Sequence, residues 1–178
     1  MKSLKNIGLL ALVLIVFTAN AQTDKATTIK IVEEKSYVFV ATTAVPLNSA
    51  DITAVFSKMS GPPNSGAVNL TGSNYDLKIT PDSIVAYLPY YGRAYVAPFG
   101  NDENGYKFTS KKFVYESKKG KKKGWDILIQ SKDIRDNVRM NLSVSESGYA
   151  TLNVISNNKQ SISYNGYLSE IKKDNPAK

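Results

Sequence analysis

The sequence predicts a mainly β protein, folded as an antiparallel up-and-down barrel of about eight strands with a short N-terminal helix. Three observations lead to this fold class. Hydrophobic and polar residues alternate along most segments of the chain, which indicates strands with one buried face and one wet face. Turn-forming residues separate these segments at intervals of roughly 8–12 residues. Nearly every connection after Tyr75 is short, and short connections imply that consecutive strands are antiparallel neighbours.

The first residues have the layout of a secretory signal peptide. Lys2 and Lys5 precede an apolar run over residues 7–17, and a small-residue cleavage site at 19–21 ends just before Gln22. The apolar run is too short for a membrane anchor, because a helix needs about 20 apolar residues to cross a bilayer.

We therefore expect cleavage of the signal peptide, residues 1–21, which leaves residues 22–178 as a single domain. The expected location is the periplasm or the extracellular medium. Because the chain has no cysteine for a lipid anchor and no second apolar segment, we expect neither a lipoprotein nor an integral membrane protein.

The composition excludes several kinds of chemistry. The chain contains no histidine and no cysteine, so it has no imidazole metal ligand, no thiol nucleophile and no serine–histidine–aspartate triad. No acidic loop of the calcium-binding type appears. We expect no catalytic residues, no metal and no cofactor. The formal net charge of +8 would attract anionic lipid, polysaccharide or nucleic acid, although no nucleic-acid fold signature is present and we expect no such partner.

The first elements vary in how clearly they can be assigned. Residues 23–34 fit either a helix, in which Ala26, Ile29 and Val32 share a face, or a strand; we favour the helix. Residues 37–43 form a strand and 67–71 a short one. The structure of residues 45–66 cannot be assigned from the sequence.

The later elements alternate more regularly. Residues 75–80 and 84–88 form a hairpin around a turn at Pro81. Residues 106–116 read as one strand, with Phe108, Phe113 and Tyr115 as its large side chains. Four more strands are expected, joined by turns at "SKKGKKKG", "ESG" and "NNKQ": residues 125–130, 138–145, 149–156 and 161–171.

Two sequence blocks, "YLPYYGRAYVAPFG" and "SNNKQSISYNGY", together with "GWDILIQ", resemble the domain-of-unknown-function family 4251. Its members are exported proteins typical of Bacteroidetes. The resemblance covers roughly residues 32–168 and implies a lipocalin-like barrel with an added N-terminal helix. It implies no activity and assigns no functional residue.

The block "AYLPYYGRAYVAPFG" is the first candidate site. As a ligand-binding surface it would use the aromatic rings and the arginine of Tyr87, Tyr90, Tyr91, Arg93 and Tyr95. As a structural element it would end a strand at Pro89 and bend at Gly92, with the tyrosines covering the barrel end. We favour the structural interpretation, since buried aromatic residues belong to a core more often than to a ligand site.

A lysine-rich turn is the second candidate. The side chains of Lys118, Lys119, Lys121, Lys122 and Lys123 could contact anionic lipid or glycan of the cell envelope. The alternative is a solvated hairpin tip whose charge protects a sheet edge from aggregation, and we favour it.

Polar side chains give two weaker candidates. The amide groups of Asn157, Asn158, Gln160 and Asn165 could bind sugar hydroxyls, although asparagine is also common in turns. A glycosidase would need a pair of carboxylates, for which the candidates are Asp76, Asp82, Asp126 and Glu146. No pair of these is placed across a cleft by the sequence.

Three functions follow, in order of preference. The first is a non-enzymatic periplasmic binding or structural module, whose barrel holds a small apolar or amphipathic ligand. The second is an envelope interaction protein that uses the lysine-rich turn. The third is a hydrolase of unknown type. A barrel interior lined by Tyr87, Tyr91 and Arg93 would favour the first.

Overall fold

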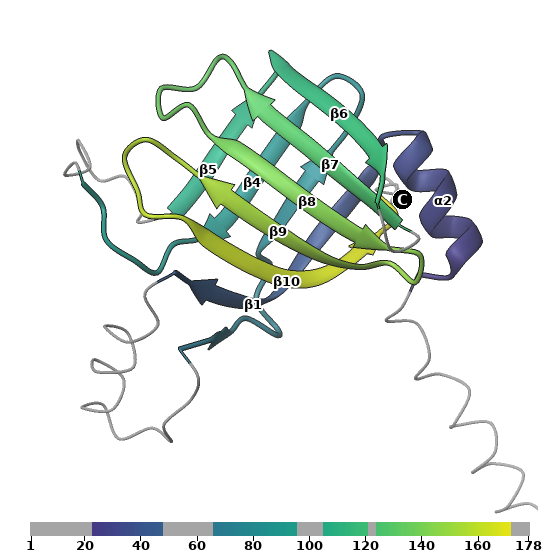
Figure 1. The fold of residues 1–178 in the computed structure, drawn as a ribbon, viewed down its shortest axis with the longest axis horizontal. Helices are drawn as coiled ribbons and strands as arrows, with labels where there is room; N and C mark the ends of the chain where they lie inside the picture. The colour runs from purple at the N-terminus through teal and green to yellow at the C-terminus, as the bar shows by residue number, and fades with distance from the viewer. Residues whose placement is uncertain (1–22, 48–65, 96–104, 121–123, 172–178) are drawn as a thin grey trace, which may run out of the picture.

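The computed structural model describes residues 23–47, 66–95, 105–120 and 124–171, and it confirms the predicted fold class. Among the described residues, ten strands form one antiparallel sheet. Nine of them follow one path that curls into a nearly closed barrel, and one short helix lies against one end of it (Figure 1). The expected signal peptide, residues 1–21, lies outside the described residues.

The elements follow the chain in the order helix, then strands. Their bounds are α2 (Lys25–Glu33), β1 (Tyr37–Pro46), β2 (Val68–Asn69), β3 (Asp76–Ile79), β4 (Ile84–Pro89), β5 (Gly105–Ser110), β6 (Phe113–Lys119), β7 (Gly124–Ser131), β8 (Arg139–Ser145), β9 (Tyr149–Ile155) and β10 (Ile162–Ser169).

The first strand, β1, joins the early strands of the chain to the last one. The spatial order is β5-β4-β3-β1-β10-β9-β8-β7-β6, so β1 pairs with β10 on one side and with β3 on the other, and the short β2 also pairs with β1. Every pairing is antiparallel. The two outer strands, β5 and β6, follow each other in the chain but are not paired in the sheet. The barrel is therefore an up-and-down meander with an open seam.

The prediction of a single strand over residues 106–116 is wrong, because two strands, β5 and β6, occupy this range. The chain turns at 111–112, where the carboxylate of Asp133 accepts hydrogen bonds from the Ser110 hydroxyl and from the backbone N–H groups of Lys111 and Lys112. These three bonds hold a turn that ends β5 and starts β6.

Helix α2 confirms the favoured interpretation of residues 23–34. Asp24 caps its N-terminus by accepting a hydrogen bond from the Thr27 N–H at 3.0 Å. The buried face consists of Thr28, Ile31 and Val32, whereas Ala26 is exposed, so the predicted face is only partly right. Within the described ranges, no helix combines the length and the apolar character that a membrane crossing requires.

The first strand is longer than predicted and contains an irregularity. β1 runs to Pro46, and its register against β10 shifts between Ala41 and Thr43, which marks a β-bulge at Thr42. Strand β2 replaces the short strand expected over residues 67–71. The unassigned segment 45–66 falls mostly on residues 48–65, which lie outside the described residues.

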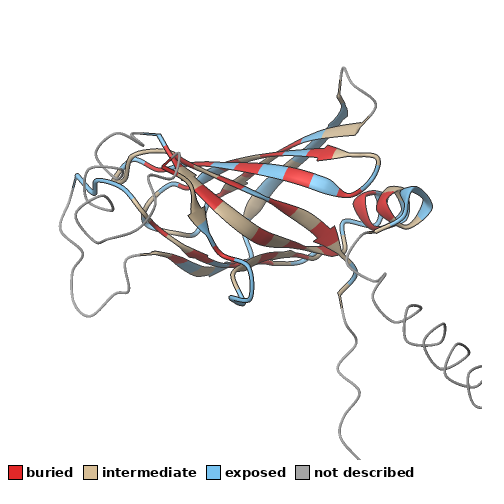
Figure 2. Cartoon of the chain, turned by 90° about the horizontal axis from the view of Figure 1, so that it is seen from below, coloured by how far each residue is buried: buried red, intermediate tan, exposed pale blue. Residues whose placement is uncertain are grey.

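Large side chains pack in the described interior. Alternate residues of β4, β8 and β9 point inward, and burial follows that alternation along these strands (Figure 2). The largest fully buried side chains are those of Tyr37, Tyr164, Phe39, Leu77, Ile79, Ile84, Leu88, Ile127, Ile129, Met140, Leu142 and Leu152. They come from strands all around the barrel and pack into one core.

A candidate ligand-binding groove on the outer face

The described tyrosines of the "AYLPYYGRAY" block lie in different surroundings. Tyr87 lies on the outer face of β4, 39% exposed, where its ring contacts Tyr75 at 5.4 Å between centroids. Tyr90 is buried, and its hydroxyl lies 2.8 Å from the backbone oxygen of Arg93, to which it donates a hydrogen bond. Tyr91 is half-buried against the core.

The end of the same block is held through its backbone. Ala94 forms a β-bridge with Lys159, and the Tyr95 N–H donates to the carbonyl of Asn158 at 2.8 Å. The side chains of Arg93 and Tyr95 are exposed at this point. The block therefore leaves β4, bends, and runs beside the β9–β10 turn at the barrel end opposite to α2 (Figure 1).

Gly92 lies where the bend needs a residue without a side chain. A Cβ atom there would lie 2.7 Å from the Tyr90 hydroxyl, so any larger residue would displace that ring. Close approach, rather than a positive φ, explains this glycine.

Aromatic rings and one lysine close this end of the barrel. The rings of Tyr90 and Tyr106 meet edge to face at 5.8 Å, and the Lys159 ammonium lies 4.8 Å from the centre of the Tyr106 ring. Lys159 also donates to the Gly105 carbonyl, and the Tyr164 hydroxyl donates to the Pro89 carbonyl. Burial raises the pKa of the Tyr106 and Tyr164 hydroxyls above their usual value, so both stay neutral.

The lysine-rich turn is only partly described. Lys118 and Lys119 are exposed at the end of β6, while Lys121, Lys122 and Lys123 lie outside the described residues. The carbonyl of Gly124 accepts a hydrogen bond from the Gly120 N–H at 2.9 Å, which closes the hairpin.

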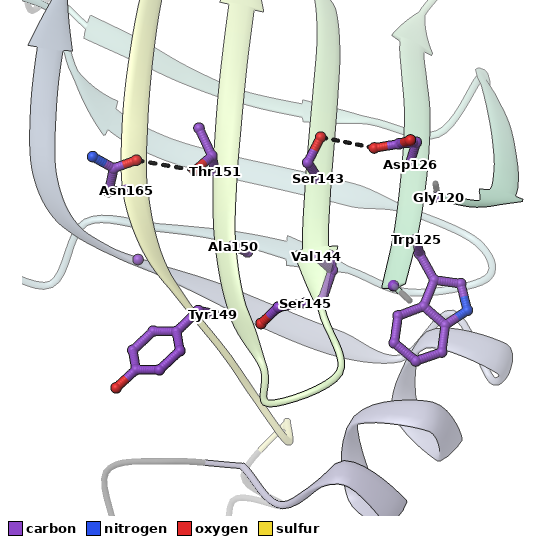
Figure 3. Close-up of a pocket in the computed structure, with 12 residues that line it drawn as sticks. Gly120, Trp125, Asp126, Ser143, Val144, Ser145, Tyr149, Ala150, Thr151 and Asn165 are labelled. Carbon is purple, nitrogen blue, oxygen red and sulfur yellow. Dashed lines mark hydrogen bonds between the residues drawn. The ribbon is translucent and has the colours of Figure 1, made fainter. Parts of the chain in front are cut away.

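A different surface forms a groove. It is an open depression of about 680 Å³ on the outer face of β7 to β10, near the hairpin turns that lie toward α2 (Figure 3). We call it the outer groove, and its lining residues are Gly120, Gly124, Trp125, Asp126, Ser143, Val144, Ser145, Tyr149, Ala150, Thr151, Asn165 and Gly166.

Four polar side chains cross the outer groove in one row. Sheet register places Asp126 opposite Ser143, Ser143 opposite Thr151, and Thr151 opposite Asn165. All four are exposed, because the strand period of two turns them outward. Neighbouring strands lie about 4.8 Å apart, so the row spans about 14 Å.

The row is ordered by its own hydrogen bonds. The Ser143 hydroxyl donates to one oxygen of the Asp126 carboxylate at 2.9 Å, and the Thr151 hydroxyl donates to the Asn165 side-chain oxygen at 3.0 Å (Figure 3). These bonds leave the second Asp126 oxygen as an acceptor and the Asn165 NH₂ group as a donor. The row therefore offers a ligand acceptors at one end and donors at the other.

Small residues shape the floor of the groove. A Cβ atom on Gly166 would lie 1.9 Å from the Val40 carbonyl oxygen, and one on Gly124 would lie 2.2 Å from that of Val144. Both glycines thus allow backbones to approach closely where the sheet bends. Gly166 also lies directly opposite Ala41, beside the β-bulge of β1.

Aromatic residues lie at two edges of the groove. Tyr149, at the start of β9, is 59% exposed. Trp125, the only tryptophan of the chain, is half-buried at the start of β7 and packs against the core. None of the twelve lining residues is a lysine or an arginine, and Asp126 is the only carboxylate among them.

The sequence predicted the groove only in fragments. Asp126 was a candidate as half of a carboxylate pair and Asn165 as a sugar-binding amide, while Ser143, Thr151 and Tyr149 were not singled out. Of the other three carboxylate candidates, Asp76, Asp82 and Glu146, none lines the outer groove. Burial raises the pKa of the Asp76 carboxyl, and Glu146 pairs with Lys25 at 2.8 Å. Among the described residues, no cluster of acidic side chains suited to a metal ion occurs.

Comparisons with known proteins identify the family. The family model of DUF4251, a domain of unknown function, matches residues 19–168, and the chain therefore belongs to this family. The crystal structure of a DUF4251 family protein from Bacteroides eggerthii DSM 20697 has a similar fold, with a TM-score of 0.54 and 11% sequence identity over 82% of this chain and 87% of that one. No curated protein matches the chain.

Proposed function

We propose that this member of the family is a non-enzymatic, exported binding module that holds its ligand on the outside of the barrel. The observation that carries the proposal is the outer groove, in which four exposed polar side chains are ordered in pairs by hydrogen bonds. Side chains held in this way lose less conformational freedom when a ligand binds, which favours binding.

The packing of the interior supports an external site. Tyr37, Phe39 and Tyr164 are fully buried, and the Tyr37 hydroxyl lies 3.1 Å from that of Tyr115. A small apolar or amphipathic ligand among these core residues would have to displace them, at a cost of the kind that overpacking brings. Tyr87, Tyr90, Tyr91, Arg93 and Tyr95 would then serve the barrel end rather than a ligand.

The other parts of the proposal rest on the sequence. Export rests on the expected signal peptide over residues 1–21. The absence of catalysis rests on the lack of histidine and cysteine and on the single carboxylate among the groove residues.

The test uses the mature chain, residues 22–178, and a variant that fills the groove. Thr151→Tyr places a ring in the middle of the polar row, while Thr109→Tyr adds the same ring to the exposed outer face of β5, far around the sheet. Both variants keep Trp125 as the only tryptophan, whose emission reports on the groove. The proteins are mixed with lipid, polysaccharide and peptide fractions of a Gram-negative envelope and examined by native mass spectrometry and fluorescence.

We expect one fraction to bind the wild type and Thr109→Tyr equally and to bind Thr151→Tyr at least about tenfold more weakly. Equal binding to all three proteins, or binding of no fraction to the wild type, would contradict the proposal.

A second candidate function is contact with an anionic envelope surface through Lys118, Lys119, Lys121, Lys122 and Lys123. The observation in its favour is the exposure of Lys118 and Lys119 on the outermost strand, β6. Sedimentation with anionic vesicles at low and high salt tests it. Replacement of the five lysines by alanine should abolish salt-sensitive binding to the vesicles. Unchanged binding after that replacement would contradict this second function.

A further inference from the structure

We propose that the ligand of the outer groove is a neutral saccharide chain that lies across strands β7 to β10. This inference rests on the proposed function, because it names the ligand class of the same groove. It is argued from the hydrogen-bonding groups, the apolar surfaces, the charge and the extent of the groove.

The hydrogen-bonding groups suit a polyhydroxyl ligand. With Ser143 donating to it, the Asp126 carboxylate keeps free acceptor positions for ligand hydroxyls. At the other end, the Asn165 NH₂ group can donate to ring or hydroxyl oxygens, because its own oxygen is taken by Thr151. Sugar hydroxyls both donate and accept, so one ligand can satisfy both ends of the row.

The apolar surfaces suit the carbon-bound faces of sugar rings. The side chain of Ala150 is buried on the inner face and Gly166 has none, so neither projects into the groove, and the exposed Tyr149 ring stands beside the polar row. An aromatic ring provides a broad apolar face together with a polar tip. Flat rings edged with hydroxyls, which are apolar on one face, fit this combination better than a flexible acyl chain does.

The charge of the groove argues against an anionic ligand. The lining residues that the structure describes include one carboxylate and neither a lysine nor an arginine, so an anion among them would meet the charge of Asp126 without a cationic lining partner. Lys118 is the register partner of Asp126 on β6, but it lies beyond the lining residues. A neutral ligand therefore suits the described lining residues better than a lipid headgroup or a nucleotide does.

The extent of the polar row argues for a chain rather than a single sugar. The row spans four strands and about 14 Å. Beyond Asn165 the same register continues to Thr43 on β1, so the polar row extends past the groove on that side. A ligand longer than one ring can contact Asp126 and Asn165 together.

The experiment titrates the mature chain with linear hexasaccharides of glucose, xylose, mannose and N-acetylglucosamine. Oligogalacturonate and phosphatidylglycerol vesicles serve as anionic probes. Trp125 emission and isothermal titration calorimetry measure binding. We expect at least one neutral hexasaccharide to bind saturably, and neither anionic probe to compete with it.

Two variants locate that binding. Asp126→Asn should weaken it roughly ten- to a hundredfold, the loss expected for one hydrogen bond to a charged group. Glu116→Gln, which removes a carboxylate from the exposed face of β6 outside the groove, should stay within about twofold. Far-UV circular dichroism verifies that both variants fold, and Asn165→Ala gives an independent loss at the other end of the row.

The outcomes separate this inference from the proposed function. Binding of a lipid or peptide fraction that Thr151→Tyr blocks, with no saccharide bound, would overturn the saccharide and leave the external binding module in place. Saccharide binding that ignores Asp126→Asn and Asn165→Ala would also overturn it. If nothing binds the wild type, both proposals fall.

Discussion

On strands β7 to β10, neighbouring residues of the chain point to opposite faces of the sheet. One row of directly opposed residues points inward, each no more than 2% exposed: Ile127, Leu142, Leu152 and Tyr164. The adjacent residue on each strand points outward and forms the polar row of the outer groove: Asp126, Ser143, Thr151 and Asn165. One register therefore sets both the core and the candidate site, because a slip of one residue would exchange them.

The two rows differ in their surroundings and in what they contribute to folding. The inner row is apolar, closely packed and needed for stability. The outer row makes only short-range hydrogen bonds between neighbouring strands, which contribute little to folding when exposed. We propose that these polar side chains are kept in order for binding, since their hydrogen bonds bring little structural gain.

The largest difference is expected between two neighbours on β9. Leu152→Ala removes a fully buried side chain and should lower the free energy of unfolding by about 2–5 kcal/mol. Thr151→Ala removes an exposed hydroxyl and should cost less than about 1 kcal/mol. Urea denaturation of residues 22–178 measures both. Similar costs for the two variants would show that the outer row is structural.

A glycine beneath the groove should link the two faces. Gly166→Ala puts a Cβ atom 1.9 Å from the Val40 carbonyl oxygen, so β1 and β10 must move apart. Overpacking of this kind typically costs about 1–3 kcal/mol. Because the floor moves as well, the same variant should lose ligand binding, as titration would reveal. A Gly166→Ala variant as stable as the wild type would contradict this prediction.

One polar contact on the outside does serve the fold, and pH separates it from the groove. Hydrogen bonds from Ser110, Lys111 and Lys112 lower the pKa of the Asp133 carboxyl from its usual 3.8 to about 2. A lowered pKa gives stability that is present above pH 3.8 and is lost as the pH falls toward 2.

The matching experiment compares wild type with Asp133→Asn between pH 5 and 2. We expect the variant to have the lower Tm at pH 5 and a weaker dependence of Tm on pH over this range, since no carboxyl titrates at that turn. Parallel curves for the two proteins would argue that Asp133 does not hold the β5–β6 turn.

The smallest effect is expected at the surface ion pair between α2 and the β8–β9 turn. Lys25 and Glu146 lie 2.8 Å apart, but their side chains are 60% and 34% exposed. Solvent screens such a pair, so Lys25→Met should change the free energy of unfolding by no more than about 0.5 kcal/mol. A larger loss, measured by the same urea denaturation, would mean that α2 depends on this contact rather than on its buried face.

Much of the fold could be predicted from the sequence because alternation with a period of two is a local signal. It located the strands from β7 to β10 and the β3–β4 hairpin. It failed at 106–116 because Phe108 and Phe113 are five residues apart and cannot share one face of an unbroken strand. The shift in alternation between these two residues indicates the turn at Lys111. The carboxylate of Asp133, which holds that turn, is distant in the sequence and reaches it only in the folded structure.

The site was harder to predict because it depends on register between strands. Asp126 and Asn165 are 39 positions apart in the chain, and Ser143 and Thr151 look like ordinary outward residues of two strands. Only the pairing across three ladders brings them into one row. The aromatic block around Tyr90 is evident from the sequence, because its aromatic residues are close together in the chain and no strand pairing is needed to group them.

The most direct test of the central claim is to map ligand binding by NMR. A ¹⁵N-labelled mature chain is titrated with the fraction or hexasaccharide that binds it, and amide shifts are followed residue by residue. We predict that the largest shifts fall on Asp126, Ser143, Thr151 and Asn165, while those of the buried Leu77, Ile79 and Ile84 on β3 and β4 stay small. Large shifts at these core residues with little change along the polar row would place the ligand inside the barrel and contradict the account.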